Sequence, residues 1–245
     1  MRRGFLMILL GLAVALASTR ASADNVEVRF GGFFPQGGPG SQPSSCSDTS
    51  ENPTRCNLFL DLSELFGATR KGWEGAYGGI EYNRRLNSAL ELGFHIDGYG
   101  RTRYTSYVDY VRDDNSEIEQ ELHLSVVPIG VTLRVFPLGS RRALSPYIAG
   151  GGDLVIWHYS EFGDFIDFST ENENWDVVTA DRQVSGTTPG FHVAAGIRVP
   201  VSYDFSLTAE VRYLKAKPQE MERPFEVYEI DPSGASATVG LNLRF

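Results

Sequence analysis

The chain ends in the stretch Ala235-Ser236-Ala237-Thr238-Val239-Gly240-Leu241-Asn242-Leu243-Arg244-Phe245. Apolar and polar residues alternate through it without a break, and the last residue is aromatic. A period of two is typical of a β-strand that presents one apolar face and one polar face. The stretch therefore predicts a strand with Leu241, Leu243 and Phe245 on its apolar face.

Seven other stretches alternate in the same way, at about 26–34, 73–85, 89–104, 118–136, 146–159, 191–199 and 205–213. Each is close to the ~9–11 residues that a tilted strand needs to cross a bilayer. Beyond the N-terminal segment no apolar stretch approaches 18 residues, which excludes a helical membrane protein. The pattern predicts an all-β fold, an eight-stranded antiparallel up-and-down transmembrane β-barrel.

The connections between these stretches alternate in length. Short ones lie near 84–88, 137–145 and 200–204, and long ones near 35–72, 105–117, 160–188 and 215–233. Outer-membrane barrels show this asymmetry, with short periplasmic turns and long extracellular loops. Within 118–136 the alternation changes phase at Val127-Pro128, which predicts a β-bulge beside the proline.

The N-terminal segment has the features of a secretory signal. Met1-Arg2-Arg3 is basic, an apolar run follows, and Ala21-Ser22-Ala23 is a small-residue cleavage site before Asp24. We expect residues 1–23 to be removed and residues 24–245 to form a single barrel domain. The formal charge of -9 would then become about -12, since three arginines and no acid are lost. Nucleic acid is excluded as a partner for so acidic a chain.

The chain resembles the small eight-stranded outer-membrane barrels, the group of the OmpA transmembrane domain, OmpX and OmpW. The resemblance rests on the eight segments, the loop asymmetry, the C-terminal Phe245 and the hairpin sequence 130–152. It implies a bacterial outer-membrane location, a monomer, and contact with outer-membrane lipid and lipopolysaccharide. It also implies that Leu241, Leu243 and Phe245 form the signal read by the outer-membrane assembly machinery.

If the apolar faces point to lipid, charged residues of the strands point inward. An eight-stranded barrel is barely wide enough for its own side chains, so opposite charges inside it should pair. We expect a salt-bridged interior rather than an open path. Its predicted members are Glu27, Arg29, Glu81, Glu91, His95, Asp97, Glu121, His123, Arg198, Glu210, Arg212, Asn242 and Arg244.

Three functions fit these features. The first is a non-enzymatic structural or surface-interaction role, and the second is a narrow channel for small solutes. The third is a lipid A-modifying enzyme, because His123-Leu124-Ser125 has the His-x-Ser spacing of the lipid A deacylase barrels. The acid that completes the triad in that family has no counterpart here, since Pro137 stands at the expected position. We favour the first function.

The loops add three expectations. Cys46 and Cys56, the two cysteines of the chain, should form one disulfide in the first long loop. The stretch 58–66 has more apolar residues than a free loop needs, so it should be an amphipathic helix on the membrane surface or a segment inside the barrel mouth, and we favour the membrane surface. The loops at 105–117 and 160–188 are acidic, and the second could instead extend its strand pair. No cofactor or metal-binding motif is present.

Overall fold

The computed structural model describes residues 24–36, 56–58, 62, 65–68, 70–112, 114–140, 142–167, 176–225 and 228–245. Residues 1–23 and Cys46 lie outside this set, so signal cleavage and the disulfide stay predictions. Among the described residues, no helix has the length and apolar character needed to cross a bilayer.

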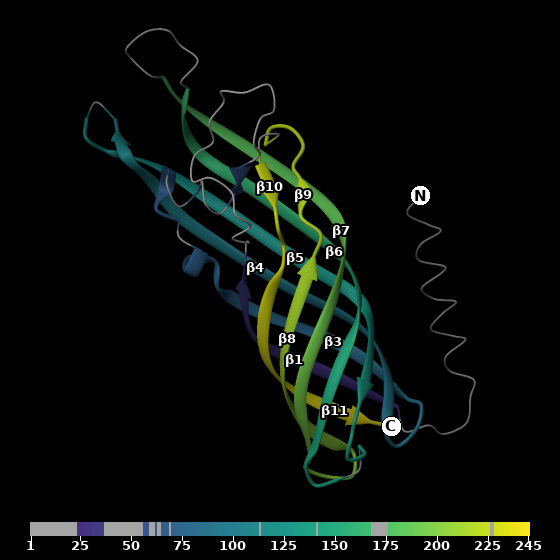
Figure 1. Ribbon diagram of the computed structural model, residues 1–245. Helices are drawn as coiled ribbons and strands as arrows, with labels where there is room; N and C mark the ends of the chain where they lie inside the picture. The colour runs from purple at the N-terminus through teal and green to yellow at the C-terminus, as the bar shows by residue number, and fades with distance from the viewer. Residues whose placement is uncertain are drawn as a thin grey trace.

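Eight long strands in the described residues form one closed antiparallel ring, in the order β1-β11-β8-β7-β6-β5-β4-β3 (Figure 1). Their bounds are β1 Asn25–Pro35, β3 Gly75–Arg85, β4 Leu90–Val111, β5 Glu117–Val135, β6 Ser145–Asp167, β7 Asp176–Pro200, β8 Phe205–Ala216 and β11 Gly234–Arg244. The C-terminal strand closes the ring against the first one, with Asn25 opposite Arg244 and Pro35 opposite Gly234. The predicted fold class is confirmed.

The two ends of the barrel differ. The turns after β3, β5 and β7 lie at the end that holds the C-terminus, which we call the short-turn end (Figure 1). The opposite, long-loop end carries the 3-10 helix η1, Arg70–Trp73. It also carries a small sheet in which β2, Cys56–Asn57, and β9, Gln219–Glu220, flank β10, Tyr228–Ile230.

Strand length varies around the ring. Strands β4, β5, β6 and β7 have 22, 19, 23 and 25 residues, whereas β1, β3 and β11 have 11 and β8 has 12. About 9–11 residues cross a bilayer. The four long strands therefore continue well past the level where the others end, and Figure 1 shows them projecting at the long-loop end. We call this projecting part of β4–β7 the extension.

The extension corrects the predicted loop boundaries. Residues 105–111 belong to β4, and residues 160–167 and 176–188 belong to β6 and β7. The alternative in which the third long loop extends its strand pair is the correct one. Backbone pairing continues to Asp167 opposite Asp176, so residues 160–167 and 176–188 are paired strands rather than a free loop.

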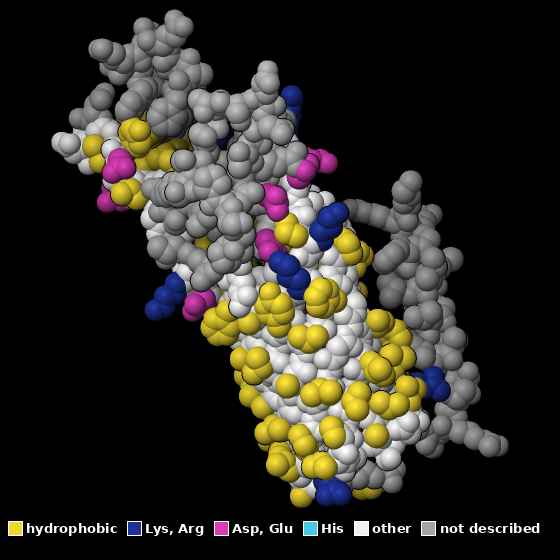
Figure 2. All heavy atoms as spheres, in the orientation of Figure 1, with side chains coloured by type: hydrophobic (Ala, Val, Ile, Leu, Met, Phe, Trp, Pro, Cys, Tyr) yellow, Lys and Arg dark blue, Asp and Glu magenta, His cyan; other side chains and the backbone are white. Residues whose placement is uncertain are grey.

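The outer surface of the barrel changes along its length. Apolar side chains cover the part nearer the short-turn end, and acidic and basic side chains appear beyond them towards the long-loop end (Figure 2). Exposed members of the apolar band include Val28, Phe30, Ile80, Ile96, Leu133, Ile148, Phe191, Val193, Leu207, Val211, Val239 and Leu241. A band of this kind matches the lipid-facing surface of a transmembrane barrel.

Along strand β5 the inward-facing residues change from apolar to polar without a β-bulge. Its pairing with β6 runs in unbroken register from Gln120 to Val135, so the bulge expected at Val127-Pro128 is wrong. Between Pro128 and the short-turn end the inward residues are polar, such as Thr132 and Arg134. Between Pro128 and the long-loop end they are apolar, such as Leu122 and Leu124. The alternation is continuous, and only the environment on each side changes.

This reversal also corrects two predicted interior residues. Glu121 and His123 lie on the outer face of β5, because the neighbouring Leu122 and Leu124 are the buried ones. Beyond the apolar band the outer face meets water rather than lipid, so polar residues are stable there and apolar residues turn inward. The same holds for β6, where Trp157 and Tyr159 are buried inside the barrel.

An apolar core fills the long-loop end of the barrel. Leu58, Leu62 and Phe66 of the first long connection are buried in it, together with residues of the extension and of the last connection. Other members are Tyr99, Tyr107, Leu122, Leu124, Val155, Trp157, Tyr159, Met221, Phe225 and Ile230. For these described residues of 58–66, the favoured placement on the membrane surface is therefore wrong, and the alternative inside the barrel mouth is correct.

The core predicts unequal effects of two neighbouring substitutions in β5. Leu124→Ala should lower the free energy of unfolding by about 2–5 kcal/mol, because it removes a buried side chain from a packed cluster. Ser125→Ala, on the outer face, should change it by no more than about 0.5 kcal/mol. Urea unfolding in detergent micelles measures both. Equal losses would contradict the inward placement of Leu124.

Candidate functional site: the polar interior of the barrel

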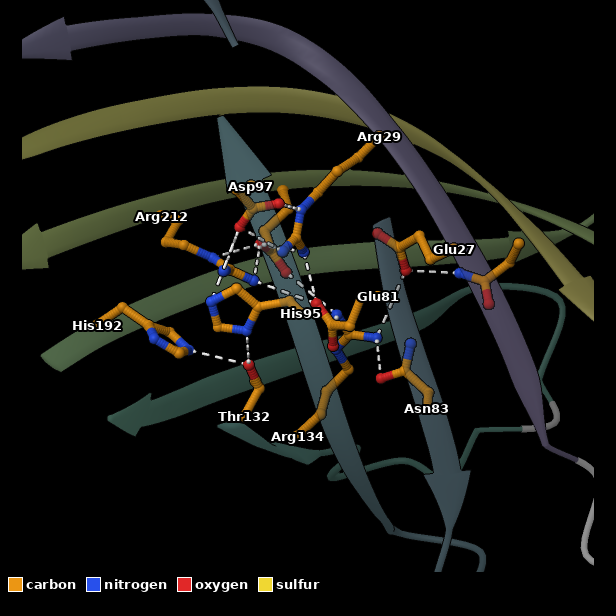
Figure 3. A network of polar contacts seen from close by, with 12 residues as sticks. Glu27, Arg29, Glu81, Asn83, His95, Asp97, Thr132, Arg134, His192 and Arg212 are labelled. Carbon is orange, nitrogen blue, oxygen red and sulfur yellow. Dashed lines mark hydrogen bonds and ion pairs between the residues drawn. The ribbon is translucent and has the colours of Figure 1, made fainter. Parts of the chain in front are cut away.

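Arg29 of β1 lies in the interior of the barrel and bonds to acids of two other strands. Its guanidinium binds Asp97 of β4 through two hydrogen bonds, Nε to Oδ1 at 2.9 Å and Nη2 to Oδ2 at 2.7 Å. Its Nη1 also donates to Glu81 of β3 at 2.6 Å (Figure 3). Gly79 permits this arrangement, because a Cβ there would lie 1.8 Å from Asp97 Oδ1. One arginine therefore links three neighbouring strands.

Two further arginines contact these acids and also Glu210 of β8. Arg212 of β8 contacts Asp97 at 3.2 Å and Glu210 at 3.0 Å. Arg134 of β5 contacts Glu81 at 3.1 Å and Glu210 at 3.5 Å. The side chains in these pairs are 0–4% exposed, so the cluster fills the barrel interior at this level.

A second group of pairs lies nearer the short-turn end. Arg198 of β7 donates to both oxygens of Glu91 at 2.8 and 2.9 Å, and Asn242 donates to Glu27 at 2.6 Å. Aromatic rings cover one arginine of each group: the guanidinium of Arg134 lies 4.6 Å from the ring centroid of Tyr147, and that of Arg198 lies 5.0 Å from the ring centroid of Phe136. Cation–π contacts of this kind add to the ion pairs.

A ring of four polar side chains lies beside the arginine cluster, towards the apolar core. His95 Nε2 is 2.9 Å from Asp153 Oδ1, and His192 Nδ1 is 2.7 Å from Asp153 Oδ2. The opposite nitrogens of both imidazoles meet one hydroxyl, Thr132 Oγ1, at 3.2 and 3.1 Å. Within the described residues, His95, Asp153 and His192 are the group with the geometry to hold a metal ion.

Comparison with known protein families identifies the family of this chain. The family model for the outer membrane protein beta-barrel domain matches residues 7–245. The chain belongs to this family. Members of one barrel family can differ in activity, so the family gives the architecture and leaves the role to be argued from the site.

Solved structures with a similar chain path include three outer-membrane proteins at low identity. Neisserial surface protein A is 12% identical, with a TM-score of 0.45, and the match covers 92% of this chain and 98% of that protein. Ail of Yersinia pestis is 10% identical, with a TM-score of 0.36 and coverages of 92% and 100%. The N-terminal barrel of Pseudomonas aeruginosa OprF is 12% identical, with a TM-score of 0.34 and coverages of 90% and 97%. The comparison with curated proteins finds no match.

Most residues predicted for the interior of this outer-membrane barrel lie there. The buried ones are Glu27, Arg29, Glu81, Glu91, His95, Asp97, Arg198, Glu210, Arg212 and Asn242. Arg244 lies at the short-turn rim, where its Nη1 is 3.5 Å from the Tyr203 carbonyl oxygen. Glu121 and His123 lie outside, and His123 Nδ1 contacts Thr102 Oγ1 at 3.0 Å. Leu241, Leu243 and Phe245 are exposed on the outer face.

Several other polar residues of the interior were not among those predicted from the sequence. They are Asn83, Arg85, Thr132, Arg134, Asp153 and His192. Thr132, Arg134 and His192 follow from alternation alone, since each stands between outward apolar neighbours. Asp153 follows three glycines, which give no facing signal, so its place beside the histidines comes from strand pairing.

The arginine cluster predicts a large cost for breaking one pair. Arg29→Met should destabilise the barrel by about 3–5 kcal/mol, because it leaves buried carboxylates without a partner. Adding Asp97→Asn should restore part of that loss. Arg112→Met, which breaks the half-exposed pair with Asp164 in the extension, is the matched control and should cost at most about 1 kcal/mol. Urea unfolding that showed equal costs for Arg29 and Arg112 would contradict a central role for the cluster.

Proposed function

We propose that this protein is a closed, non-enzymatic barrel of the bacterial outer membrane that anchors an extracellular surface for a cationic polypeptide. The single observation that carries the proposal is a groove on the outer face of the extension, lined by carboxylates and aromatic rings. The family supports the membrane location, with the apolar band in contact with lipid and lipopolysaccharide. The exposed Leu241, Leu243 and Phe245 of the C-terminal strand support recognition of this chain by the outer-membrane assembly machinery.

The filled interior favours an anchor over a channel. Side chains from all eight long strands meet in it, and the arginine–carboxylate pairs described above are almost fully buried. Above them, the apolar core occupies the long-loop end. An ion would have to break several buried pairs and then cross an apolar layer, and both steps are costly.

The groove combines charge with exposed rings. Glu117, Glu119 and Glu121 alternate along β5, so their side chains share the outer face. Tyr104 of β4 is 78% exposed and Phe162 of β6 is 55% exposed, and both line the same hollow of about 590 Å³. Carboxylates beside aromatic faces match the chemistry of lysine and arginine side chains, through ion pairs and cation–π contacts.

The neighbouring turn keeps further negative charge near the groove. Asp114, in the turn between β4 and β5, accepts hydrogen bonds from the hydroxyl and the backbone N–H of Ser116. The hydroxyl bond, and then the backbone bond, lower the pKa of the Asp114 carboxyl below its ordinary value. Asp114 therefore stays ionised at neutral pH and adds to long-range attraction of a cationic partner.

The groove predicts salt-sensitive binding of a hexa-arginine peptide to the barrel in phosphatidylcholine nanodiscs. The triple change of Glu117, Glu119 and Glu121 to glutamine should weaken binding by about fivefold to tenfold, because three weak ion pairs are lost. Fluorescence anisotropy of a labelled peptide at several salt concentrations measures this.

The matched control changes Glu74 and Glu222 to glutamine and Asp109 to asparagine. These exposed acids lie outside the groove lining, and the net charge changes by the same amount. We expect less than a twofold effect. Equal weakening by both triple variants would assign binding to overall charge and reject the groove.

The closed interior predicts that the barrel in planar lipid bilayers shows no steady ionic conductance. The reason is that the interior ion pairs are 0–4% exposed. Single-channel recording tests this, with Arg212→Ser as the interior variant and Glu117→Gln as the control outside it. Regular conductance steps in the wild type that change with Arg212→Ser and not with Glu117→Gln would reject the anchor and support the channel.

A further inference from the structure

We propose that His95, Asp153 and His192 form a binding site for a divalent transition-metal ion of the zinc class. The three residues come from β4, β6 and β7, and their ligand atoms all lie within 4.8 Å of one another. All three are buried. Two imidazole nitrogens and one carboxylate are a ligand set that zinc takes in proteins.

The geometry directs both imidazoles at one carboxylate. His95 Nε2 and His192 Nδ1 each approach a different oxygen of the same carboxylate, at 2.9 and 2.7 Å. Ligands around a tetrahedral zinc ion lie about 3.3 Å apart, because each is about 2.0–2.1 Å from the metal. A small outward shift of the Asp153 carboxylate would therefore open the space for an ion. Gly130 leaves that space free of a side chain, since a Cβ there would lie 2.6 Å from Asp153 Oδ1.

Thr132 holds the opposite side of both rings in the manner of a metal site. Its hydroxyl oxygen is 3.2 Å from His95 Nδ1 and 3.1 Å from His192 Nε2. With a metal on the other nitrogens, both of these carry N–H groups and donate to the two lone pairs of the Thr132 oxygen. A hydrogen bond from the non-ligating nitrogen usually fixes the tautomer of metal-bound histidine.

Without a metal the same ring has a hydrogen-bond mismatch. Two neutral imidazoles that donate to Asp153 turn two acceptor nitrogens towards Thr132. The hydroxyl has a single proton and can serve one of them. A metal ion removes the mismatch, because both inner nitrogens then become ligands and both outer nitrogens become donors.

The charge balance points to a bound cation at the same place. In the described interior from the short-turn end to Asp153, five arginines and six acids are buried: Arg29, Arg85, Arg134, Arg198 and Arg212, with Glu27, Glu81, Glu91, Asp97, Asp153 and Glu210. Each of the other five acids has an arginine within 4.0 Å. The ion-pair partners of Asp153 among the described residues are the two histidines. A buried carboxylate needs a compensating positive charge, which either one proton on the two imidazoles or a metal ion would supply.

The surroundings indicate when the ion would enter. The arginine–carboxylate cluster lies beside the ring (Figure 3). Val155, two residues beyond Asp153 in β6, belongs to the apolar core. We therefore expect the metal to bind as the barrel folds and to exchange slowly afterwards. This timing separates the site from exposed histidines, which bind and release metal at once.

The test refolds the barrel from urea into detergent micelles with Co²⁺, followed by EDTA and gel filtration. Elemental analysis should find about one Co²⁺ retained per barrel, with visible absorption bands of nitrogen- and oxygen-bound cobalt. Cobalt added after folding should not be retained. Asp153→Asn should reduce retained metal at least tenfold, and Thr132→Val should increase the rate of metal loss.

The chain offers a matched control, since it has four histidines and two of them, His123 and His158, lie on the outer faces of β5 and β6. The double variant H123Q/H158Q should retain cobalt like the wild type. Heat-modifiable gel mobility shows that each variant has folded. X-ray absorption of the zinc-loaded wild type, which needs no variant, should show two imidazole ligands.

Two results would overturn the proposal. One is retention no greater in the wild type than in Asp153→Asn when both are folded. The other is a zinc spectrum without imidazole ligands. Either result would mean that one proton, shared between His95 and His192, balances Asp153.

Discussion

The structure depends on the pairing of buried charge inside a narrow barrel. Arg29, Arg134 and Arg212 lie among Glu81, Asp97 and Glu210, and each arginine contacts more than one of these acids. In a low-dielectric interior an unpaired charge is costly, so every strand that contributes a charge is tied to the strands that contribute its partners. The cluster joins residues more than 100 positions apart, such as Arg212 and Asp97, and so supports closure of the ring.

A second constraint is the change of environment along the long strands. Inside the apolar band, β5 points Arg134 inward and Leu133 outward, whereas beyond Pro128 it points Leu124 inward and His123 outward. Burial of apolar area drives both halves, towards lipid in one and towards a protein core in the other. The barrel consequently has two parts along its length, one with a charged interior and one with an apolar interior. The His95–Asp153–His192 ring lies at their junction.

This stacking separates the possible roles of the protein. Ion pairs and apolar side chains fill the interior, so it has little room for the passage of a solute. The outer face of the extension is free of that demand, and there Glu117, Glu119 and Tyr104 can face a partner. Family membership alone would not distinguish these roles, because the same barrel carries different loops and extensions.

Alternation of residues determined the number of strands and most of the charged interior, because side chains in a strand point alternately to opposite faces. The alternation of short and long connections indicated their antiparallel order. The alternation of residues misplaced Glu121 and His123, since alternation fixes which residues share a face and not whether that face meets lipid, water or core. Asp153 among its glycines, and the folding of Leu58 and Leu62 into the barrel mouth, gave no periodic signal. Only the tertiary structure decided them, because they depend on contacts between segments far apart in the chain. The charges and the alternation are local properties of the sequence, whereas the pairing of Asp153 with two histidines exists only once three strands are side by side.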